Sequence, residues 1–193
     1  MKLVILDRDG VINHESAAFV KNPDEWMALP GSLQGIARLS QAGWTVVVAT
    51  NQSGLARGLF DVSALNAIHN KMYRELAQAG GVIDSLFICP HGPNDGCTCR
   101  KPLPGLYTDI ARRYDVDLAG VPALGDSLRD LQAAAAAGCA PWLALTGNGI
   151  KTRDQGGLPP GTRICADLAE FADTLLKEEA ESKPAGRGAG AGA

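Results

Sequence analysis

Short apolar segments recur along this chain with helix-like patterns between them, and this alternation constrains the fold more than any other feature. Each segment has the length of a strand and lacks a polar face, as expected for strands buried on both sides of a parallel sheet. The predicted strands cover residues 2–6, 44–49, 85–88, 121–124 and 142–145.

The segments between these strands carry apolar residues at helical spacing. Helices are predicted at residues 32–41, from Asp61 or Ser63 to about 79, at 104–114 and at 128–137. Ser32 is the expected N-cap of the first helix, and Gly43 is its expected stop. The alternation predicts an α/β fold with a doubly wound, mainly parallel sheet, whose ligands bind outside the carboxyl ends of the strands.

The chain has 193 residues, of which 46% are apolar, and this suits one domain at residues 1–177 without a separate cap domain. The end of the chain, 178–193, is charged and then rich in glycine and alanine, so we expect a disordered tail. Residues 13–31 show no clear periodicity and are predicted to form an irregular loop or active-site flap.

A net charge of −3 disfavours a surface that coats nucleic acid, although it permits a small phosphorylated ligand held by a local basic cluster. No apolar run reaches the roughly 18 residues that a membrane helix needs, and the N-terminus does not resemble a signal peptide. We therefore expect a cytoplasmic protein with no nucleic-acid or membrane partner. A monomer is favoured because no surplus apolar surface helix stands out.

The first predicted strand ends in "ILDRDG", which contains two carboxylates, Asp7 and Asp9. Residues two apart project to the same side if the strand geometry persists, so both could address one ligand, and Gly10 lets the chain turn. An isolated pattern of this kind is equally compatible with a simple turn.

A second strand ends in "LGDSLRD", which adds Asp126 and, at the start of the next helix, Asp130. Parallel strands bring these carboxylates to one edge of the sheet. Clustered carboxylates raise one another's pKa values unless a cation neutralises them, and oxygen-rich sites suit Mg²⁺. The sequence therefore predicts a magnesium site.

Two other strand ends carry groups that suit an anion. Thr50 and Asn51 close "WTVVVATN", and "CRKP" supplies Arg100 and Lys101. A phosphate group would satisfy all of these donors, whereas each pair alone could be a turn or a solvated surface.

The motifs "DRDG", "TNQSG", "RKPLPG" and "GDSLRD", in this order, resemble the four motifs of the haloacid-dehalogenase-type phosphatases across about residues 1–172. The resemblance implies a Rossmann-like fold in which Asp7 is the nucleophile that forms an aspartyl-phosphate. It implies that Asp9 protonates the leaving alkoxide and then activates water.

The same resemblance implies a ligand set. Mg²⁺ would be bound by Asp7 and Asp126 and by the backbone carbonyl of Asp9, with Asp130 in the outer shell. The phosphoryl oxygens would be held by Thr50, Asn51 and Lys101. Arg8, between the two carboxylates of its motif, is expected to point away and to be structural.

The loop "CPHGPNDGCTCRKP" contains Cys89, His91, Cys97 and Cys99, a set that fits a tetrahedral structural Zn²⁺ site. Free thiols or a Cys97–Cys99 disulfide are the alternatives, and both suit the cytoplasm less well. Zinc here would stabilise a loop without a core and would aim the following cations at the substrate.

This loop directly before "RKP" resembles the branch of the superfamily that hydrolyses sugar bisphosphates, which is close to the histidinol-phosphate phosphatases. A bisphosphate needs a second cationic site, for which Arg100 is the first choice and Arg57 the second. His14 could enter the pocket, form a cap or face solvent, whereas His69 is expected to be structural.

Two readings without phosphatase activity remain open from the sequence. A zinc-stabilised module could bind nucleic acid, supported by the pair Arg100 and Lys101 but opposed by the acidic chain. A regulatory domain could accept a phosphoryl group on Asp7, although Asp9 as acid/base promotes turnover instead.

Overall fold

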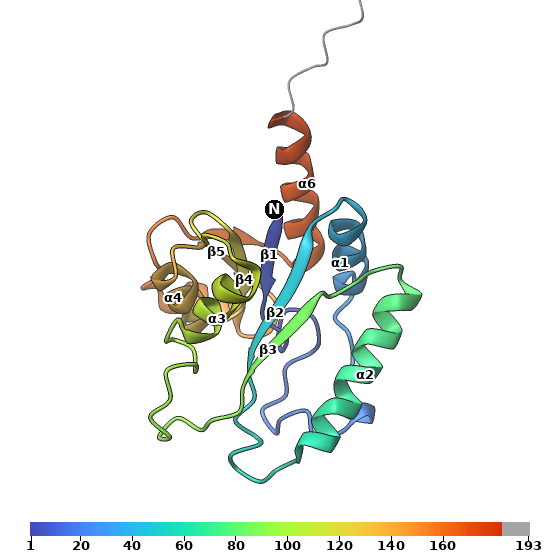
Figure 1. Ribbon diagram of the computed structural model, residues 1–193, viewed down its shortest axis with the longest axis vertical. Helices are drawn as coiled ribbons and strands as arrows, with labels where there is room; N and C mark the ends of the chain where they lie inside the picture. The colour runs from blue at the N-terminus through green and yellow to red at the C-terminus, as the bar shows by residue number, and fades with distance from the viewer. Residues whose placement is uncertain (183–193) are drawn as a thin grey trace, which may run out of the picture.

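The computed structural model describes residues 1–182, which form a parallel sheet of six strands with helices on both faces (Figure 1). The strands lie in the order β3-β2-β1-β4-β5-β6, and every neighbouring pair is parallel. Their bounds are β1 Leu3–Leu6, β2 Thr45–Asn51, β3 Ser85–Cys89, β4 Pro122–Gly125, β5 Ala140–Ala144 and β6 Arg163–Cys165. The predicted α/β fold is confirmed.

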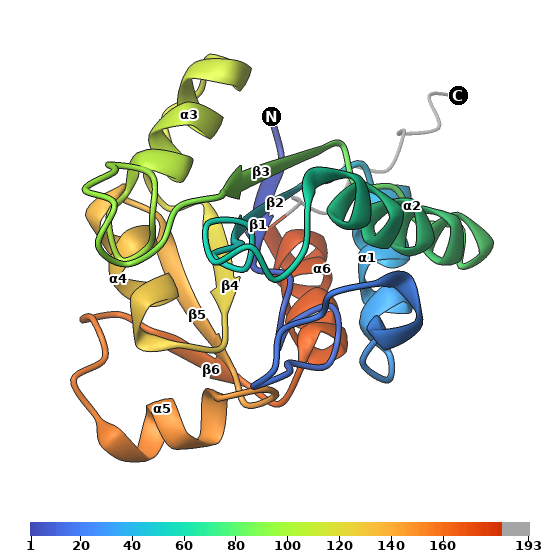
Figure 2. The same cartoon turned by 90° about the horizontal axis from the view of Figure 1, so that it is seen from below.

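The helices cover the two faces of the sheet unequally (Figure 2). One face packs against α1, α2 and α6, and the other against α3 and α4, while α5 follows β5. Their bounds are α1 Ser32–Gln41, α2 Val62–Gln78, α3 Gly105–Tyr114, α4 Leu128–Ala136, α5 Gly149–Gln155 and α6 Leu168–Ser182, with a short 3-10 helix, η1, at Pro23–Glu25.

Strand β1 shows why the apolar runs are continuous. Val4 and Leu6 point into the core beneath α1, α2 and α6, whereas Leu3 and Ile5 point into the core beneath α3 and α4. Because successive side chains alternate across a strand, a strand covered on both faces must be apolar at every position.

The N-cap of helix α1 Ser32–Gln41 differs from the sequence prediction. Helix α1 begins at Ser32 as predicted, but its N-cap is Gly31, in a left-handed conformation with φ of 75°. The Ser32 hydroxyl is not a cap, because it donates to the carbonyl oxygens of Ile12 at 2.7 Å and Leu29 at 2.9 Å. These two hydrogen bonds attach the loop between β1 and α1 to the start of α1.

The sequence prediction placed no element at β6, α5 or α6, and it expected a disordered tail from residue 178. Helix α6 instead extends to Ser182. The Glu179 carboxylate accepts hydrogen bonds from Lys2 at 2.5 Å and from the Trp44 indole at 3.0 Å, which holds the end of this helix against β1 and β2. The remainder of the predicted tail, 183–193, lies outside the described residues.

The predicted irregular loop at 13–31 is confirmed, with η1 as its regular part. Lys71 on α2 donates to the carbonyl oxygens of Pro23 at 2.9 Å and Trp26 at 2.8 Å, and thereby anchors the loop to the helix. Among residues 1–182, no helix combines the length and the apolar character needed to cross a membrane.

Candidate active site

The carboxyl ends of three neighbouring strands bring the predicted site residues together. Asp7 directly follows β1, Asp126 directly follows β4, and Thr50 and Asn51 end β2. Lys101 reaches the same place from the loop between β3 and α3. Because β1 lies between β2 and β4, Asp7 is at the centre of this group.

Lys101 is buried between two carboxylates. Its Nζ lies 3.0 Å from Oδ1 of Asp7 and 2.7 Å from Oδ1 of Asp130, and it also donates to the carbonyl oxygen of Ala49 at 2.8 Å. Burial alone would lower the pKa of Lys101, but the two carboxylates raise it, so the ammonium stays charged. Asp130, predicted to lie in the outer shell, also accepts from the backbone N–H of Ser127 at 3.0 Å.

Lys101 does not neutralise the whole cluster. Ligand oxygens of Asp7, Asp126 and Asp130 all lie within 4.8 Å of one another. Burial raises the pKa of Asp7 to about 6, with repulsion from Asp130 and Asp9 adding to the effect and Lys101 opposing it. Burial and repulsion from Asp130 and Asp7 raise the pKa of Asp126 to about 8. A set of buried oxygen ligands with excess negative charge fits a divalent cation such as Mg²⁺.

Two glycines let the chain approach Asp126 closely. A Cβ added to Gly10 would lie 2.1 Å from Oδ2 of Asp126, and one added to Gly147 would lie 2.2 Å from the same oxygen. The backbone N–H of Asn148 donates to this oxygen at 2.7 Å. The loop after β5 therefore fixes the orientation of Asp126.

Hydrogen-bond donors surround the carboxylate of Asp9. Oδ1 accepts from Arg8 Nη2 and from Asn13 Nδ2, each at 2.9 Å, and Oδ2 accepts from Arg8 Nη2 at 3.0 Å and from Gln52 Nε2 at 2.8 Å. Burial works to raise the pKa of Asp9, but Arg8 and the hydrogen bonds from Asn13 and Gln52 outweigh it, so the pKa lies below its usual value.

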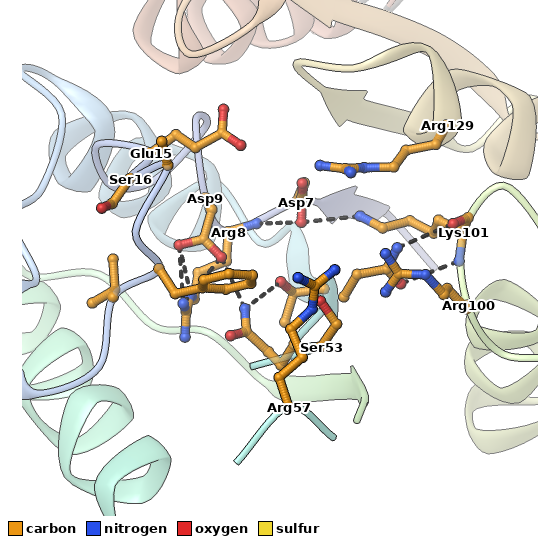
Figure 3. Close-up of a pocket in the computed structure, with 16 residues that line it drawn as sticks. Asp7, Arg8, Asp9, Glu15, Ser16, Ser53, Arg57, Arg100, Lys101 and Arg129 are labelled. Carbon is orange, nitrogen blue, oxygen red and sulfur yellow. Dashed lines mark hydrogen bonds and ion pairs between the residues drawn. The ribbon is translucent and has the colours of Figure 1, made fainter. Parts of the chain in front are cut away.

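The expectation that Arg8 points away from both carboxylates is wrong. Strand β1 ends at Leu6, and the carbonyl oxygen of Arg8 then accepts the backbone N–H groups of Ile12 and Asn13 at 2.8 and 3.2 Å. The chain has left the strand conformation, so side-chain alternation no longer applies. The Arg8 side chain is instead buried against Asp9 (Figure 3).

A cavity of about 240 Å³ opens above Asp7. Asp7, Asp9 and Lys101 line it, and Arg57, Arg100 and Arg129 lie around it (Figure 3). The Arg57 guanidinium stacks on the ring of Phe19, 5.5 Å from its centroid, and Arg100 donates to the carbonyl oxygen of His91 at 3.2 Å. The flap predicted at residues 13–31 contributes Glu15, Ser16, Ala17, Phe19 and Val20 to the wall.

Thr50 and Asn51 also line this cavity. The Asn51 amide exchanges two hydrogen bonds of 3.1 Å with the backbone N–H and carbonyl of Lys101. The Thr50 hydroxyl accepts from Gln52 at 3.0 Å. Asn51 therefore positions the segment that carries Lys101 and retains a second amide hydrogen for a ligand.

Sequence reasoning assigned no role to Gln52, Glu15, Arg129 or Asn148, all of which lie at the site. Gln52 and Arg129 stand inside the motifs "TNQSG" and "GDSLRD", which was a usable signal. No sequence motif indicated that Glu15 or Asn148 belongs to the site, because only the fold brings Asn148 Nδ2 to the Glu15 carboxylate.

The two histidines outside the cysteine loop have different environments. His14 is exposed and lines a shallow depression next to the main cavity, outside its wall. His69, on α2, is buried, and its Nε2 lies 3.0 Å from Nη1 of Arg8. Burial and the charge of Arg8 lower the pKa of His69 to about 4, so the ring is neutral and accepts this hydrogen bond.

The predicted zinc ligands Cys89, His91, Cys97 and Cys99 come together in the loop after β3. The Cys89 and Cys97 sulfurs are 3.8 Å apart, and Nδ1 of His91 lies 3.7 Å from the Cys89 sulfur and 3.3 Å from the Cys99 sulfur. Zinc–sulfur bonds of about 2.3 Å in a tetrahedron require sulfur–sulfur edges of about 3.8 Å. The ligand set fits zinc, and all of these thiols are free of disulfides.

Two family models match the chain. Residues 98–171 match the HAD-hydrolase-like model, and residues 2–123 match the model described as polynucleotide kinase 3 phosphatase. With the parallel sheet and the aspartates at its strand ends, these matches define a phosphatase of the haloacid-dehalogenase-like class.

Individual relatives show to which family within this class the chain belongs. The chain is 77% identical over 178 residues to a D-glycero-beta-D-manno-heptose-1,7-bisphosphate 7-phosphatase of Bordetella bronchiseptica, covering 92% of this chain and 99% of the relative. It is 52% identical over 175 residues to the protein of the same name in Pseudomonas aeruginosa, covering 91% and 98%. The chain belongs to the family of these heptose bisphosphate phosphatases.

Solved structures agree with this assignment. The crystal structure of the D,D-heptose 1,7-bisphosphate phosphatase from B. bronchiseptica, complexed with magnesium and phosphate, matches with a TM-score of 0.92 over 92% of this chain and 99% of that chain, at 77% identity. The enzyme from Burkholderia thailandensis matches with a TM-score of 0.73 over 91% and 99%, at 53% identity. These matches favour the sugar bisphosphate phosphatase over the histidinol-phosphate, nucleic-acid and phospho-acceptor readings.

Proposed function

We propose that this enzyme removes the 7-phosphate of D-glycero-β-D-manno-heptose 1,7-bisphosphate and leaves the 1-phosphate in place. The observation that carries the proposal is the position of Asp7, beside Lys101 at the floor of a cationic cavity, in a chain 77% identical to a phosphatase of this name. Such a reaction would serve the synthesis of nucleotide-activated heptose for the lipopolysaccharide core, in the cytoplasm.

In the first proposed step, a carboxylate oxygen of Asp7 attacks the phosphorus of the 7-phosphate. The bond between phosphorus and the sugar oxygen breaks, and Asp9 in its protonated form gives its proton to that oxygen. Because Arg8, Asn13 and Gln52 favour the ionised form of Asp9, this carboxyl group must take up the proton before the step. The products of this step are the sugar 1-phosphate and an aspartyl-phosphate on Asp7. A rigid strand end suits the nucleophile because small displacements of reacting atoms slow a reaction strongly.

In the second proposed step, Asp9 takes a proton from a water molecule that attacks the phosphorus of the aspartyl-phosphate. The bond between phosphorus and Asp7 breaks, which releases inorganic phosphate and restores both carboxylates to their initial states. Thr50, Asn51 and Lys101 hold the phosphoryl oxygens and offset their charge in both steps. Fixed donors of this kind stabilise charge that develops in a transition state.

The donor set fits Mg²⁺. The metal would be held by Asp7 and Asp126 and by the backbone carbonyl of Asp9, with Asp130 nearby. When bound, the metal offsets the negative charge of the carboxylates and the phosphate. Asp130 acts through its contacts with Lys101 and Ser127, whose positions it fixes.

Zn²⁺ would be held by the ligand set in the loop after β3. Its proposed role is structural, because three thiolates and one imidazole complete a tetrahedron and leave no position for water. Cys99 immediately precedes Arg100 and Lys101, so an ordered loop fixes where these cations lie.

The non-reacting 1-phosphate requires a cation at the rim of the cavity. Arg100 remains the first candidate, because its planar guanidinium can bind phosphate in a bidentate manner, and Arg57 is the second. Both residues line the same cavity as Asp7. We further propose that the enzyme acts as a monomer.

The test compares magnesium-dependent phosphate release from the β and α anomers of the heptose bisphosphate and from histidinol phosphate. We expect the highest kcat/KM for the β anomer, with the 1-phosphate recovered intact in the product. Equal or higher kcat/KM for histidinol phosphate would overturn the proposed substrate. Arg100→Ala should raise KM for the bisphosphate more than for a heptose 7-monophosphate.

A further inference from the structure

Arg8 connects the two carboxylates of the "DRDG" motif to helix α2. Its backbone N–H donates to Oδ1 of Asp7 at 2.8 Å, and its guanidinium donates to both oxygens of Asp9 at 2.9 and 3.0 Å. On the other side, Nη1 lies 3.0 Å from Nε2 of His69. The Arg8 guanidinium is therefore held between the Asp9 carboxylate and the His69 ring.

The burial of this connection indicates that it is rigid. Arg8 is 1% exposed and His69 is 6% exposed. Helix α2 is fixed in the core by Ile68 and Met72, which are completely buried and flank His69 along the helix. A buried arginine needs a charge partner and a full set of acceptors, and Asp9 and His69 supply them.

The remaining contacts of Asp9 restrict its rotation further. Asn13 donates to Oδ1, and Gln52 donates to Oδ2. Two donors that face opposite oxygens, added to a planar guanidinium, define the plane of the carboxylate. An acid/base group gains from a fixed plane, because proton transfer requires a short and well-aligned path to the leaving oxygen.

We infer that Arg8 and His69 are positioning residues that hold the Asp9 carboxylate in line with the leaving oxygen. This inference rests on the proposed function, because it assigns Asp9 to the proton transfer of that reaction. Neither side chain is required to touch the substrate, and the Arg8 guanidinium acts through Asp9. A purely structural role for this buried pair is the competing explanation.

The test uses a series of alkyl and aryl phosphate monoesters whose leaving groups differ in pKa, with release of the first leaving group measured in a single turnover. General acid catalysis matters most for alkoxides, which are poor leaving groups, and little for nitrophenolate. Arg8→Lys keeps the charge but lacks the planar fork. We expect it to slow alkyl phosphates by about tenfold or more and p-nitrophenyl phosphate by less than about threefold.

Variants at His69 test the other end of the connection and remain informative if Arg8→Lys does not fold. His69→Gln keeps an acceptor for Arg8 and should behave like the wild type, whereas His69→Leu removes the acceptor and should reproduce the selective loss on alkyl phosphates. Arg38→Lys is the matched control, because Arg38 pairs with Asp173 on the surface, 2.9 Å away.

Equal slowing of alkyl and aryl substrates in Arg8→Lys and His69→Leu, or no slowing in either, would overturn the inference. Failure of the proposed substrate has a different signature. In that case the wild-type enzyme would not hydrolyse the heptose bisphosphate, while the monoester series would still report whether the variants change the dependence on the leaving group.

Discussion

The Nζ of Lys101 lies 3.0 Å from Oδ1 of Asp7, and both side chains are buried. Lys101 and Asp7 come from distant parts of the sequence, and they meet because the segment after the cysteine loop crosses the carboxyl end of β1. The pair places a cation beside the proposed nucleophile before any phosphate binds. Lys101 pairs with Asp7 and Asp130, so the charge of Asp126 must be offset by a proton or by another cation.

Asp7→Asn should abolish turnover and preserve the fold. The amide has nearly the same shape as the carboxylate but is a far weaker nucleophile, so we expect a loss of at least about 10³-fold in kcat. Phosphate release measures the rate, and circular dichroism measures the fold. Asp109→Asn, on the surface of α3, is the control and should keep full activity. Undiminished turnover of the Asp7 variant would contradict the assigned nucleophile.

Magnesium should bind more tightly as the pH rises. Without metal, the pKa of Asp7 is raised to about 6 and that of Asp126 to about 8, both above the usual value of 3.8. The folded state thus retains protons that the unfolded state has lost. These groups stabilise the metal-free protein fully below about pH 4, and the contribution disappears as the pH rises through 6 and 8.

Mg²⁺ must displace these protons, so its affinity should rise by roughly tenfold per pH unit between about pH 6 and 8, where one proton is displaced, and more steeply below about pH 6. Melting temperatures with and without MgCl₂ between pH 5.5 and 8.5 provide the measurement, and the magnesium-induced increase should grow with pH. Asp126→Asn should remove most of the increase. An increase that is independent of pH would argue against magnesium at these carboxylates.

Gly147→Ala should weaken magnesium binding through Asp126. The added Cβ would lie 2.2 Å from Oδ2 of Asp126 and 2.6 Å from Cα of Gly10, so the carboxylate must move. Gly156→Ala is a matched control, because Gly156 also has positive φ but nothing lies within 4 Å of the added Cβ. Both variants should lose roughly 1 kcal/mol of stability from backbone strain.

Only Gly147→Ala should in addition require about tenfold or more magnesium for half-maximal activity, since only its Cβ reaches a proposed metal ligand. Magnesium titrations of phosphate release and of melting temperature distinguish the two effects. The same magnesium requirement in both glycine variants would show that Asp126 does not hold the metal.

Cys97→Ser should release zinc and reduce activity. The wild-type protein is expected to contain about one zinc per chain, because one tetrahedral ligand set is present among the described residues. Loss of the metal should loosen the loop that positions Arg100 and Lys101, and so lower both the melting temperature and kcat. Elemental analysis and calorimetry measure the two effects.

Cys139→Ser is the control for the zinc prediction. Cys139 is buried beneath α4 and lies outside the zinc ligand set, so its replacement should leave the zinc content unchanged. A Cys97→Ser protein with the same zinc content as the wild type would refute the predicted ligand set.

Local sequence patterns predicted most of the sheet and the residues at its edge. The strands β1 to β5 are continuous apolar runs, and polar residues directly follow or end β1, β2 and β4. Strand β6 escaped prediction because it has only three residues, two of them exposed. Helix α5 escaped because it is short and begins at Gly149, the last residue of "TGNG", without a clear apolar period. Helix α6 was also not predicted, although it has 15 residues.

The sequence by itself determined which chemical groups are present and at which strand ends they stand, because strand periodicity and motif order are local properties. Only the tertiary structure decided how those groups meet: the turn after Leu6 directs Arg8 onto Asp9, α2 supplies His69, and the loop after β5 brings Asn148 to Asp126. These contacts depend on how distant segments pack, since side-chain directions past the end of a strand follow from the turn and its neighbours and not from the alternation within the strand.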